Sequence, residues 1–111
     1  MNTDRLSNKW VKVGFDRSKR LRVPNDRGTY ILANFEGEVL YVGRSVNMGR
    51  RFIEHLGSPD KNQVTSKGKP YWFYYFRCSR YEEIKLERGL INQVLLETGE
   101  LPPLNKIGGT I

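Results

Sequence analysis

The chain has 111 residues, 38% of them hydrophobic and 12% aromatic, which fits one folded domain with a single modest core. One cysteine and one histidine exclude an internal disulfide and a zinc site built from side chains of these two types, and the net charge of +7 favours a polyanionic partner. Because there is neither an apolar run that could span a membrane nor an apolar signal-peptide core at the start, we expect an intracellular, cytoplasmic protein without a membrane partner.

The positive charge is concentrated at the start of the chain. Residues 1–27 carry eight basic and three acidic residues, whereas residues 28–111 carry eleven basic and nine acidic residues. A solvated flank leaves this asymmetry unexplained, but an arm that contacts phosphates explains it through counterion release. We therefore expect a basic N-terminal arm, 1–27, that binds nucleic-acid phosphates through Lys19, Arg20 and Arg22, followed by a domain, 28–111.

Two short apolar runs after the arm predict a β-hairpin. The expected strands are 28–34 and 39–43, with a turn at 36–37, where a glycine follows a glutamate. An even-numbered loop makes Tyr30 and Tyr41 diagonal neighbours on one face, whereas an odd loop or a bulge would separate them. Taken alone, both tyrosines are ordinary half-buried strand aromatics.

Periodicity and stop signals predict the remaining elements. Ser45 or Asn47 caps the next helix, and Gly99 ends the last one. In chain order we expect a helix over 47–56, a polar loop over 57–69, a strand over 70–78, a helix over 81–98 and an irregular tail over 100–111. The strand "PYWFYYFRC" is better explained by burial of both faces than by base stacking. The fold class is α/β, with a small, mainly antiparallel three-stranded sheet flanked by helices.

A carboxylate lies on the apolar face of the last helix. The apolar residues of this helix form one continuous arc: Ile84, Leu86, Leu90, Ile91, Val94 and Leu95. Glu83 and Glu87 both fall inside the arc, but Glu83 is in the first turn, where a carboxylate suits the helix dipole. An inward carboxylate in mid-helix is unfavourable unless it meets a cation, so Glu87 either pairs with an arginine or binds a hard metal ion.

Two triplets resemble the motifs that name the GIY-YIG nuclease family. They are "GTY" at 28–30 and "YVG" at 41–43, and the segment "RSVNMGRRFIEH" follows the second. Thr29 replaces the isoleucine of the first motif, and we expect its side chain to face away from Tyr30. The resemblance covers 28–105.

Four further residues match the same family in order. Arg51 lies eight residues past the glycine of the second triplet, and His55 lies four residues later on the same helix face. Glu87 in "KLERGLI" and Asn105 in "PPLN" match the later glutamate and asparagine of the family. The spacing from Arg51 to the glutamate leaves Glu83 open as the alternative.

The resemblance implies a DNA endonuclease with one Mg²⁺ or Mn²⁺ bound by Glu87. Arg51 would clamp the scissile phosphate, because a planar guanidinium suits that task. Tyr30 is the first choice for the residue that accepts the proton of the water, which requires nearby cations to lower its pKa from about 10. Tyr41 and His55 stay open as the base or as residues that orient the water.

The resemblance also implies DNA contacts by Arg44, Lys67 and Lys69, with Asn105 orienting groups around the glutamate or the DNA backbone. A non-catalytic nucleic-acid-binding module is the alternative function, and a basic protein–protein adaptor is a third. The PD…ExK pattern formed by Asp60 and 83–85 is a coincidence, since its second half falls at a helix start. The sequence leaves open the oligomeric state, including a dimer, and the DNA target.

Overall fold

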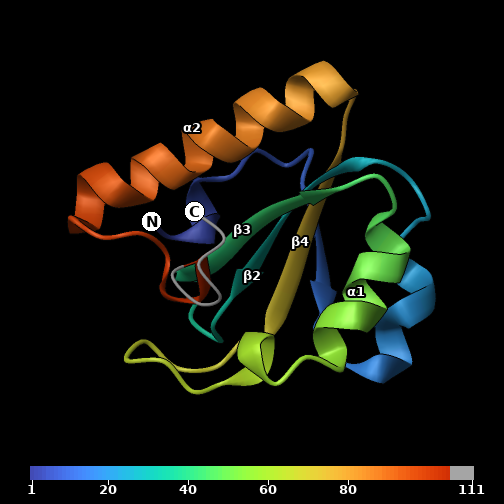
Figure 1. Cartoon of the computed structure of the whole chain (residues 1–111), viewed down its shortest axis with the longest axis horizontal. Helices are drawn as coiled ribbons and strands as arrows, with labels where there is room; N and C mark the ends of the chain where they lie inside the picture. Colours follow the sequence, from blue (N-terminus) through green and yellow to red (C-terminus); the bar gives the residue numbers. More distant parts are fainter. Residues whose placement is uncertain (106–111) are drawn as a thin grey trace.

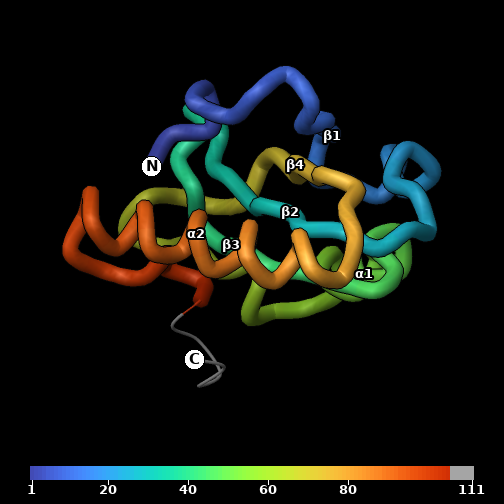
Figure 2. Tube along the Cα trace, turned by 90° about the horizontal axis from the view of Figure 1, so that it is seen from above, coloured from blue at the N-terminus to red at the C-terminus, as the bar shows by residue number. Residues whose placement is uncertain are grey.

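The computed structural model describes residues 1–105, which form one antiparallel sheet with a helix on each face (Figure 1). The strand order is β1-β4-β2-β3, and every neighbouring pair is antiparallel. The strands are β1 Val11–Gly14, β2 Gly28–Ala33, β3 Val39–Ser45 and β4 Trp72–Arg77. Viewed from above, β1 lies at the sheet edge farthest from α2 (Figure 2).

The hairpin of β2 and β3 has the predicted pairing at its centre. Tyr30 faces Gly43 and Leu32 faces Tyr41, so the two tyrosines are diagonal neighbours, with ring centroids 6.0 Å apart. A register shift follows between Leu32 and Ala33, where Ala33 faces Val39. Because this bulge lies on the turn side of the tyrosines, it does not place them on opposite faces.

The prediction of three strands was wrong by one, because the segment expected to be an arm supplies β1. Val13 and Phe15 are buried in the core, and the strand pairs with β4 from Val11↔Tyr75 to Gly14↔Trp72. Alternation of Val11, Lys12 and Val13 puts a charged side chain on the other face, which is typical of an edge strand. Charge asymmetry alone gave no sign of this pairing.

Both predicted helices are present. The first, α1 Met48–Leu56, begins after Asn47, whose side chain accepts a hydrogen bond from the Arg50 N–H. The second, α2 Arg80–Thr98, begins with a capping box between Ser79 and Glu82 and ends at Gly99, which has a left-handed φ of 77°. The last strand is shorter than predicted, since 70–71 precede β4.

Each helix covers one sheet face, because successive strand side chains point to opposite sides. On the α1 side, Tyr30, Leu32 and Phe73 pack with Phe52 of the helix. On the α2 side, Ile31 and Val42 pack with Leu90 and Val94. Within 1–105 no helix is long and apolar enough to cross a bilayer. The predicted irregular tail contains a 3₁₀ turn at Pro103–Asn105, and its part from 106 to 111 lies outside the described residues.

Candidate active site

A tyrosine–histidine pair lies at the centre of the α1 side of the sheet. The Tyr30 hydroxyl and Nε2 of His55 are 2.6 Å apart, and both side chains are buried. The Tyr30 ring stacks on Phe73 with centroids 5.1 Å apart, which fixes its orientation. Strand β2 supplies the phenol and the last turn of α1 supplies the imidazole, so two rigid elements hold this contact.

The glycine of the second triplet makes room for Tyr30. A Cβ atom at Gly43 would lie 2.5 Å from the Tyr30 hydroxyl oxygen and 2.8 Å from the ring of Tyr41. Both distances are shorter than van der Waals contact, so any other residue at this position would displace one of the two phenols. The glycine is therefore required for the close approach of Tyr30 across the strand.

Tyr41 lies at the open side of this pair. Its ring is 5.5 Å from the His55 ring and meets it edge-on, and Nζ of Lys61 lies 4.5 Å from its centroid. Burial raises the pKa of Tyr41, and the negative charge of Glu87 raises it further, which places this carboxylate within electrostatic reach of the phenol. Lys61 comes from the polar loop after α1, so this loop lies beside the site formed by Tyr30, Tyr41 and His55.

Burial decides the protonation states of the pair. It raises the pKa of Tyr30 well above the ordinary value, aided by Tyr41 and opposed by the Arg51 guanidinium. Burial, together with the charges of Lys61 and Arg51, lowers the pKa of His55 to about 3. Both groups are neutral near pH ~7. The prediction that nearby cations lower the pKa of Tyr30 was wrong, because desolvation outweighs Arg51.

Arg51 lies one turn before His55 on α1 and points toward the phenols. Its charge and a hydrogen bond act on Tyr30, while its Nε lies 2.9 Å from Oε1 of Glu54. The guanidinium is part-exposed, so it is held from one side and open to solvent on another. A planar cation held in this way suits a phosphate oxygen.

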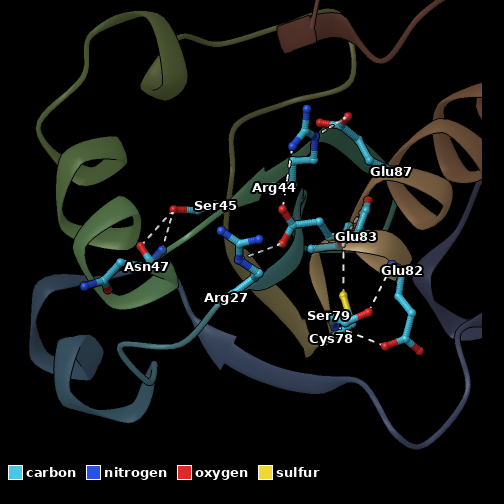
Figure 3. Close-up of polar contacts among 10 residues, drawn as sticks. Arg27, Arg44, Ser45, Asn47, Cys78, Ser79, Glu82, Glu83 and Glu87 are labelled. Atoms are coloured by element: carbon cyan, nitrogen blue, oxygen red, sulfur yellow. Dashed lines mark hydrogen bonds and ion pairs between the residues drawn. The ribbon is translucent and has the colours of Figure 1, made fainter.

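Two arginines and two glutamates form a connected group (Figure 3). Nε of Arg44 lies 3.3 Å from Glu87, and its Nη1 lies 3.6 Å from Glu83. Nε of Arg27 lies 3.7 Å from the second oxygen of Glu83. The Arg44 side chain on β3 thus bridges two carboxylates of α2.

The two glutamates differ in burial, and not as the helical arc suggested. The Glu83 side chain is 2% exposed and that of Glu87 is 24% exposed. The fully buried carboxylate is therefore the one in the first turn, where it pairs with Arg27 and Arg44. Glu87 is accessible to solvent, and its charge raises the pKa of Tyr41, so it lies within electrostatic reach of the phenol; an accessible carboxylate suits a ligand of a hydrated cation.

Asn105 fastens the end of the described chain to β3. Its side chain accepts a hydrogen bond from the Val42 N–H and donates one to the Val42 carbonyl, both at 2.9 Å. Since Val42 directly follows Tyr41, this two-point contact supports the strand that carries the phenol. Asn105 therefore lies against the backbone of β3, next to the residue that carries the phenol.

The remaining predicted DNA contacts lie in two places outside the pocket. Lys19, Arg20 and Arg22 belong to a 3₁₀ helix, Arg17–Arg22, that packs against α1. Lys67 pairs with Glu38 at 2.9 Å, and Lys69 is exposed near the start of β4. The structure thus brings Arg44 together with five of the six predicted catalytic residues: Tyr30, Tyr41, Arg51, His55 and Glu87. The lysines and arginines of the two outer places lie away from them.

Three residues at the site were not singled out from the sequence: Arg27, Glu83 as a buried ion-pair partner, and Lys61 as the cation over Tyr41. Arg27 precedes the first triplet directly, and this adjacency is the only sequence signal that pointed to it. The positions of the other two depend on the packing of α2 and of the loop, which no local pattern encodes.

Replacement of His55 by glutamine should flatten the dependence of stability on pH. The folded state keeps His55 neutral down to its pKa of about 3, whereas the unfolded chain takes up a proton below about 6.5. This contribution to the unfolding free energy is complete above pH ~6.5 and declines as the pH falls toward 3. Between pH ~7.5 and ~5 we expect wild type to lose about 2 kcal/mol more than His55→Gln in urea titrations. Equal losses in the two proteins would contradict the buried neutral imidazole.

Comparison with known proteins gives a consistent family match. The model of the GIY-YIG catalytic domain matches residues 27–98. The chain is 32% identical over 72 residues to the UvrABC system protein C of Dictyoglomus thermophilum, which covers 63% of this chain and 12% of that protein. The magnesium-bound GIY-YIG N-terminal endonuclease domain of UvrC from Thermotoga maritima matches with a TM-score of 0.54 at 23% identity, covering 69% of this chain and 86% of that chain. A point mutant of that domain, also bound to its catalytic divalent cation, matches with a TM-score of 0.55, 23% identity and the same coverage.

Proposed function

Because this chain belongs to the GIY-YIG family, we propose that it is a divalent-metal-dependent DNA endonuclease whose catalytic centre is formed by the residues around Tyr30, Tyr41 and Glu87. GIY-YIG domains are endonuclease domains that act on DNA, so the reaction is hydrolysis of a phosphodiester bond. The observation that carries the placement of the centre is the 2.6 Å contact between Tyr30 and His55, with the Tyr41 ring against His55 and the Arg51 charge acting on Tyr30. Hydrolysis requires a water that loses a proton, a stabilised phosphate and a leaving oxygen that gains a proton.

The donor set of the pocket fits Mg²⁺ or Mn²⁺, with Glu87 as the protein ligand. Within the described part of the chain, no group of three or more His, Cys, Asp or Glu side chains is arranged so that it could hold a metal ion. A single accessible carboxylate suits a cation that retains its waters and binds phosphate oxygens. Glu83 is less suitable, because it is buried and held by two arginines. When bound, the cation polarises the phosphate and stabilises the leaving oxygen.

Arg51 would bind the scissile phosphate from the α1 side. Its charge and geometry match the equatorial oxygens of a phosphate that gains negative charge during attack. Glu54 holds one edge of the guanidinium at 2.9 Å and leaves the other edge toward Tyr30. Lys61, above the Tyr41 ring, would add a second cation at this phosphate.

Tyr30 and His55 would act together on the attacking water. Because burial keeps the pKa of Tyr30 high, a free phenolate is unfavourable, and the hydroxyl takes a proton only while it gives its own to Nε2 of His55. Binding of a phosphate would neutralise Lys61 and Arg51, two of the causes that lower the pKa of His55, and so make the imidazole a better acceptor. Tyr41 would orient the water between the phenols.

The surrounding residues would bind the DNA. We assign phosphate contacts to Arg44 beside the pocket, to Lys67 and Lys69, and to the basic helix that carries Lys19, Arg20 and Arg22. Asn105 would act through Tyr41, whose strand it supports. A DNA substrate supports a cytoplasmic, intracellular location without a membrane partner. Cleavage of both strands by one site would require a dimer or two successive visits.

Supercoiled plasmid provides the test of this function. The wild-type protein incubated with Mg²⁺ or Mn²⁺ should convert the plasmid to nicked or linear DNA, and a chelator should stop the conversion. Binding without cutting in either metal, on this and on branched or gapped substrates, would contradict the endonuclease. The nicked and linear products also report whether one strand or both are cut.

Arg44 should compete with the cation for Glu87. Nε of Arg44 lies 3.3 Å from Oε1 of Glu87. A metal ion that binds Glu87 must therefore replace the Arg44 guanidinium as the positive charge beside this carboxylate. We expect Arg44→Gln to bind Mn²⁺ about threefold to tenfold more tightly in calorimetric titrations without DNA. Arg50→Gln, which removes an exposed arginine paired with Glu54, is the matched control and should leave the affinity unchanged. Weaker binding by Arg44→Gln would show that the arginine supports the cation site instead.

A further inference from the structure

Two exposed aromatic side chains and the partly buried Trp72 form a cluster at the end of the sheet, away from the tyrosine–histidine pair. Phe35, in the turn after β2, is 64% exposed, and Tyr71, just before β4, is 49% exposed. The Phe35 and Tyr71 rings meet edge-on at 4.9 Å, and Tyr71 meets Trp72 at 4.8 Å. Exposed aromatic surface of this kind is unfavourable in water and usually marks a binding site.

The cluster is fixed to the sheet by backbone and indole hydrogen bonds. Nε1 of Trp72 donates to the Phe35 carbonyl at 3.0 Å, which holds the turn against β4. The Tyr71 N–H donates to the Ala33 carbonyl at 2.8 Å, and its own carbonyl accepts from the Phe15 N–H at 2.9 Å. The rings therefore project from rigid backbone and lose little freedom when a ligand binds.

Cations border the cluster on both sides. A groove of about 520 Å³ runs along Tyr71 and Trp72, and its charged lining residues are Lys12, Lys19, Arg22 and one acid, Asp16. A second hollow of about 440 Å³, which shares Tyr71, is lined by Phe35, Lys67, Lys69 and one acid, Glu36. The two hollows, which are adjacent at Tyr71, and the three rings are called the aromatic groove below.

Most of these cations form no ion pair. Within residues 1–105, Lys12, Arg22 and Lys69 pair with no carboxylate, whereas Lys67 pairs with Glu38 and the charge of Lys19 acts on the neighbouring Asp16. Nζ of Lys12 lies 3.9 Å from the centroid of Trp72 and so covers one face of the indole. The exposed rings of the cluster are those of Phe35 and Tyr71.

We propose that the aromatic groove binds unpaired nucleobases of a nucleic-acid strand, with Phe35 and Tyr71 stacking on bases and the unpaired cations contacting phosphates. Flat apolar rings combined with a positive border match a ligand that alternates flat apolar bases with negative phosphates. A duplex hides the faces of its bases, so it offers only the phosphates.

This groove deepens the proposed function, because it selects a DNA substrate that carries a single-stranded segment. The loop after α1 links the two places along the chain. Lys61 of this loop lies over Tyr41 in the pocket, and the loop then runs along the end of the sheet to Tyr71 (Figure 1). A strand held in the groove would thus lie beside the loop that borders the catalytic pocket.

Oligonucleotide binding in a chelator tests the proposal without any cleavage. Wild type should bind a labelled single strand of roughly 12 thymidines more tightly than a duplex of equal length in fluorescence anisotropy titrations. The double variant Phe35→Ala/Tyr71→Ala should bind this strand about tenfold or more weakly and the duplex less than about twofold more weakly. Both side chains are exposed, so the fold should tolerate their removal.

Two controls and two further measurements make the outcome specific. Tyr81→Ala removes an exposed tyrosine at the start of α2 and should change neither affinity. An abasic strand of the same length keeps the phosphates and loses the bases, so the double variant should bind it as wild type does. In a Trp10→Phe background, Trp72 is the single tryptophan, and its fluorescence should change when the thymidine strand binds. If a uridine strand of the same length binds more tightly than the thymidine strand, the strand that the groove binds is RNA.

Two results would overturn the proposal: equal losses of the double variant on single strand and duplex, or no loss on either. Failure of the nuclease assignment looks different, because wild-type protein would then leave DNA intact in Mg²⁺ or Mn²⁺ whatever the result of these titrations. The aromatic groove and the catalytic site are therefore tested by separate measurements.

Discussion

Glu87→Gln should abolish metal-dependent cleavage while DNA binding persists. The glutamine keeps the size of the side chain but removes the negative charge of the one accessible carboxylate beside Tyr41. A catalytic cation contributes several kcal/mol to stabilisation of the transition state, so we expect kcat to fall about a thousandfold or more. The measurement is the single-turnover cleavage rate of plasmid in saturating Mg²⁺, with DNA affinity measured separately by anisotropy.

The controls for this variant are two neighbouring glutamates of α2. Glu82→Gln makes the same change on an exposed side chain and retains the capping box, since glutamine also caps, so cleavage should stay at the wild-type rate. Glu83→Gln removes a buried charge between two arginines, so it should lower the stability but leave metal binding in place. If Glu87→Gln cleaved at the wild-type rate, or if only Glu83→Gln lost metal binding, Glu83 would be the metal ligand.

Arg51→Ala should lower kcat about a hundredfold to a thousandfold and change KM much less. The guanidinium points toward Tyr30 and would hold the phosphate as its negative charge grows, so its effect should be greatest in the transition state. Arg51→Lys should recover only part of the rate, because an ammonium group retains the charge but not the planar pair of donors. Steady-state kinetics on a fluorogenic DNA substrate separate kcat from KM.

A matched variant is Arg50→Ala, one residue earlier on α1. Arg50 is exposed and pairs with the same Glu54, at 3.8 Å, so its loss removes a comparable surface ion pair and should leave kcat unchanged. If Arg51→Ala raised KM at an unaltered kcat, the arginine would serve binding alone.

The hairpin and the two helices could be predicted because local patterns encode them. Alternation and the turn fix the register that brings Tyr30 opposite Gly43, and the four-residue helical spacing puts Arg51 and His55 on one face. Ser79 and Gly99 mark the ends of α2 with the side-chain cap and the positive φ that their residue types favour. These signals place Tyr30, Tyr41, Arg51 and His55 on neighbouring elements, and the resemblance to the GIY-YIG family singled them out as candidate site residues.

The fourth strand could not be predicted, because its partner is distant in the sequence. Val11 pairs with Tyr75, and the four-residue strand contains a lysine that looks like part of a charged flank. Only the buried Val13 and the neighbouring Phe15 signal the core, and two such residues in a basic segment do not distinguish an edge strand from an arm.

The depth of each side chain was the other quantity that the sequence could not supply. A helical projection gives the direction of Glu83 and Glu87 but not the position of the sheet beneath them, so it did not show that Glu83 is the more buried. The same limit explains the pKa of Tyr30. The sequence names Arg51 as a neighbour, but the burial that outweighs its charge depends on packing of Phe73 and α1.

Crystals of the protein grown with Mn²⁺ test the central claim most directly, because anomalous scattering locates the cation without reference to activity. The account predicts one strong peak next to Glu87, on the side that faces Tyr41 and Arg51, with Arg44 displaced from its present contact at 3.3 Å. A peak beside Glu83, or no peak at either glutamate in crystals of active protein, would contradict the proposed metal-dependent centre.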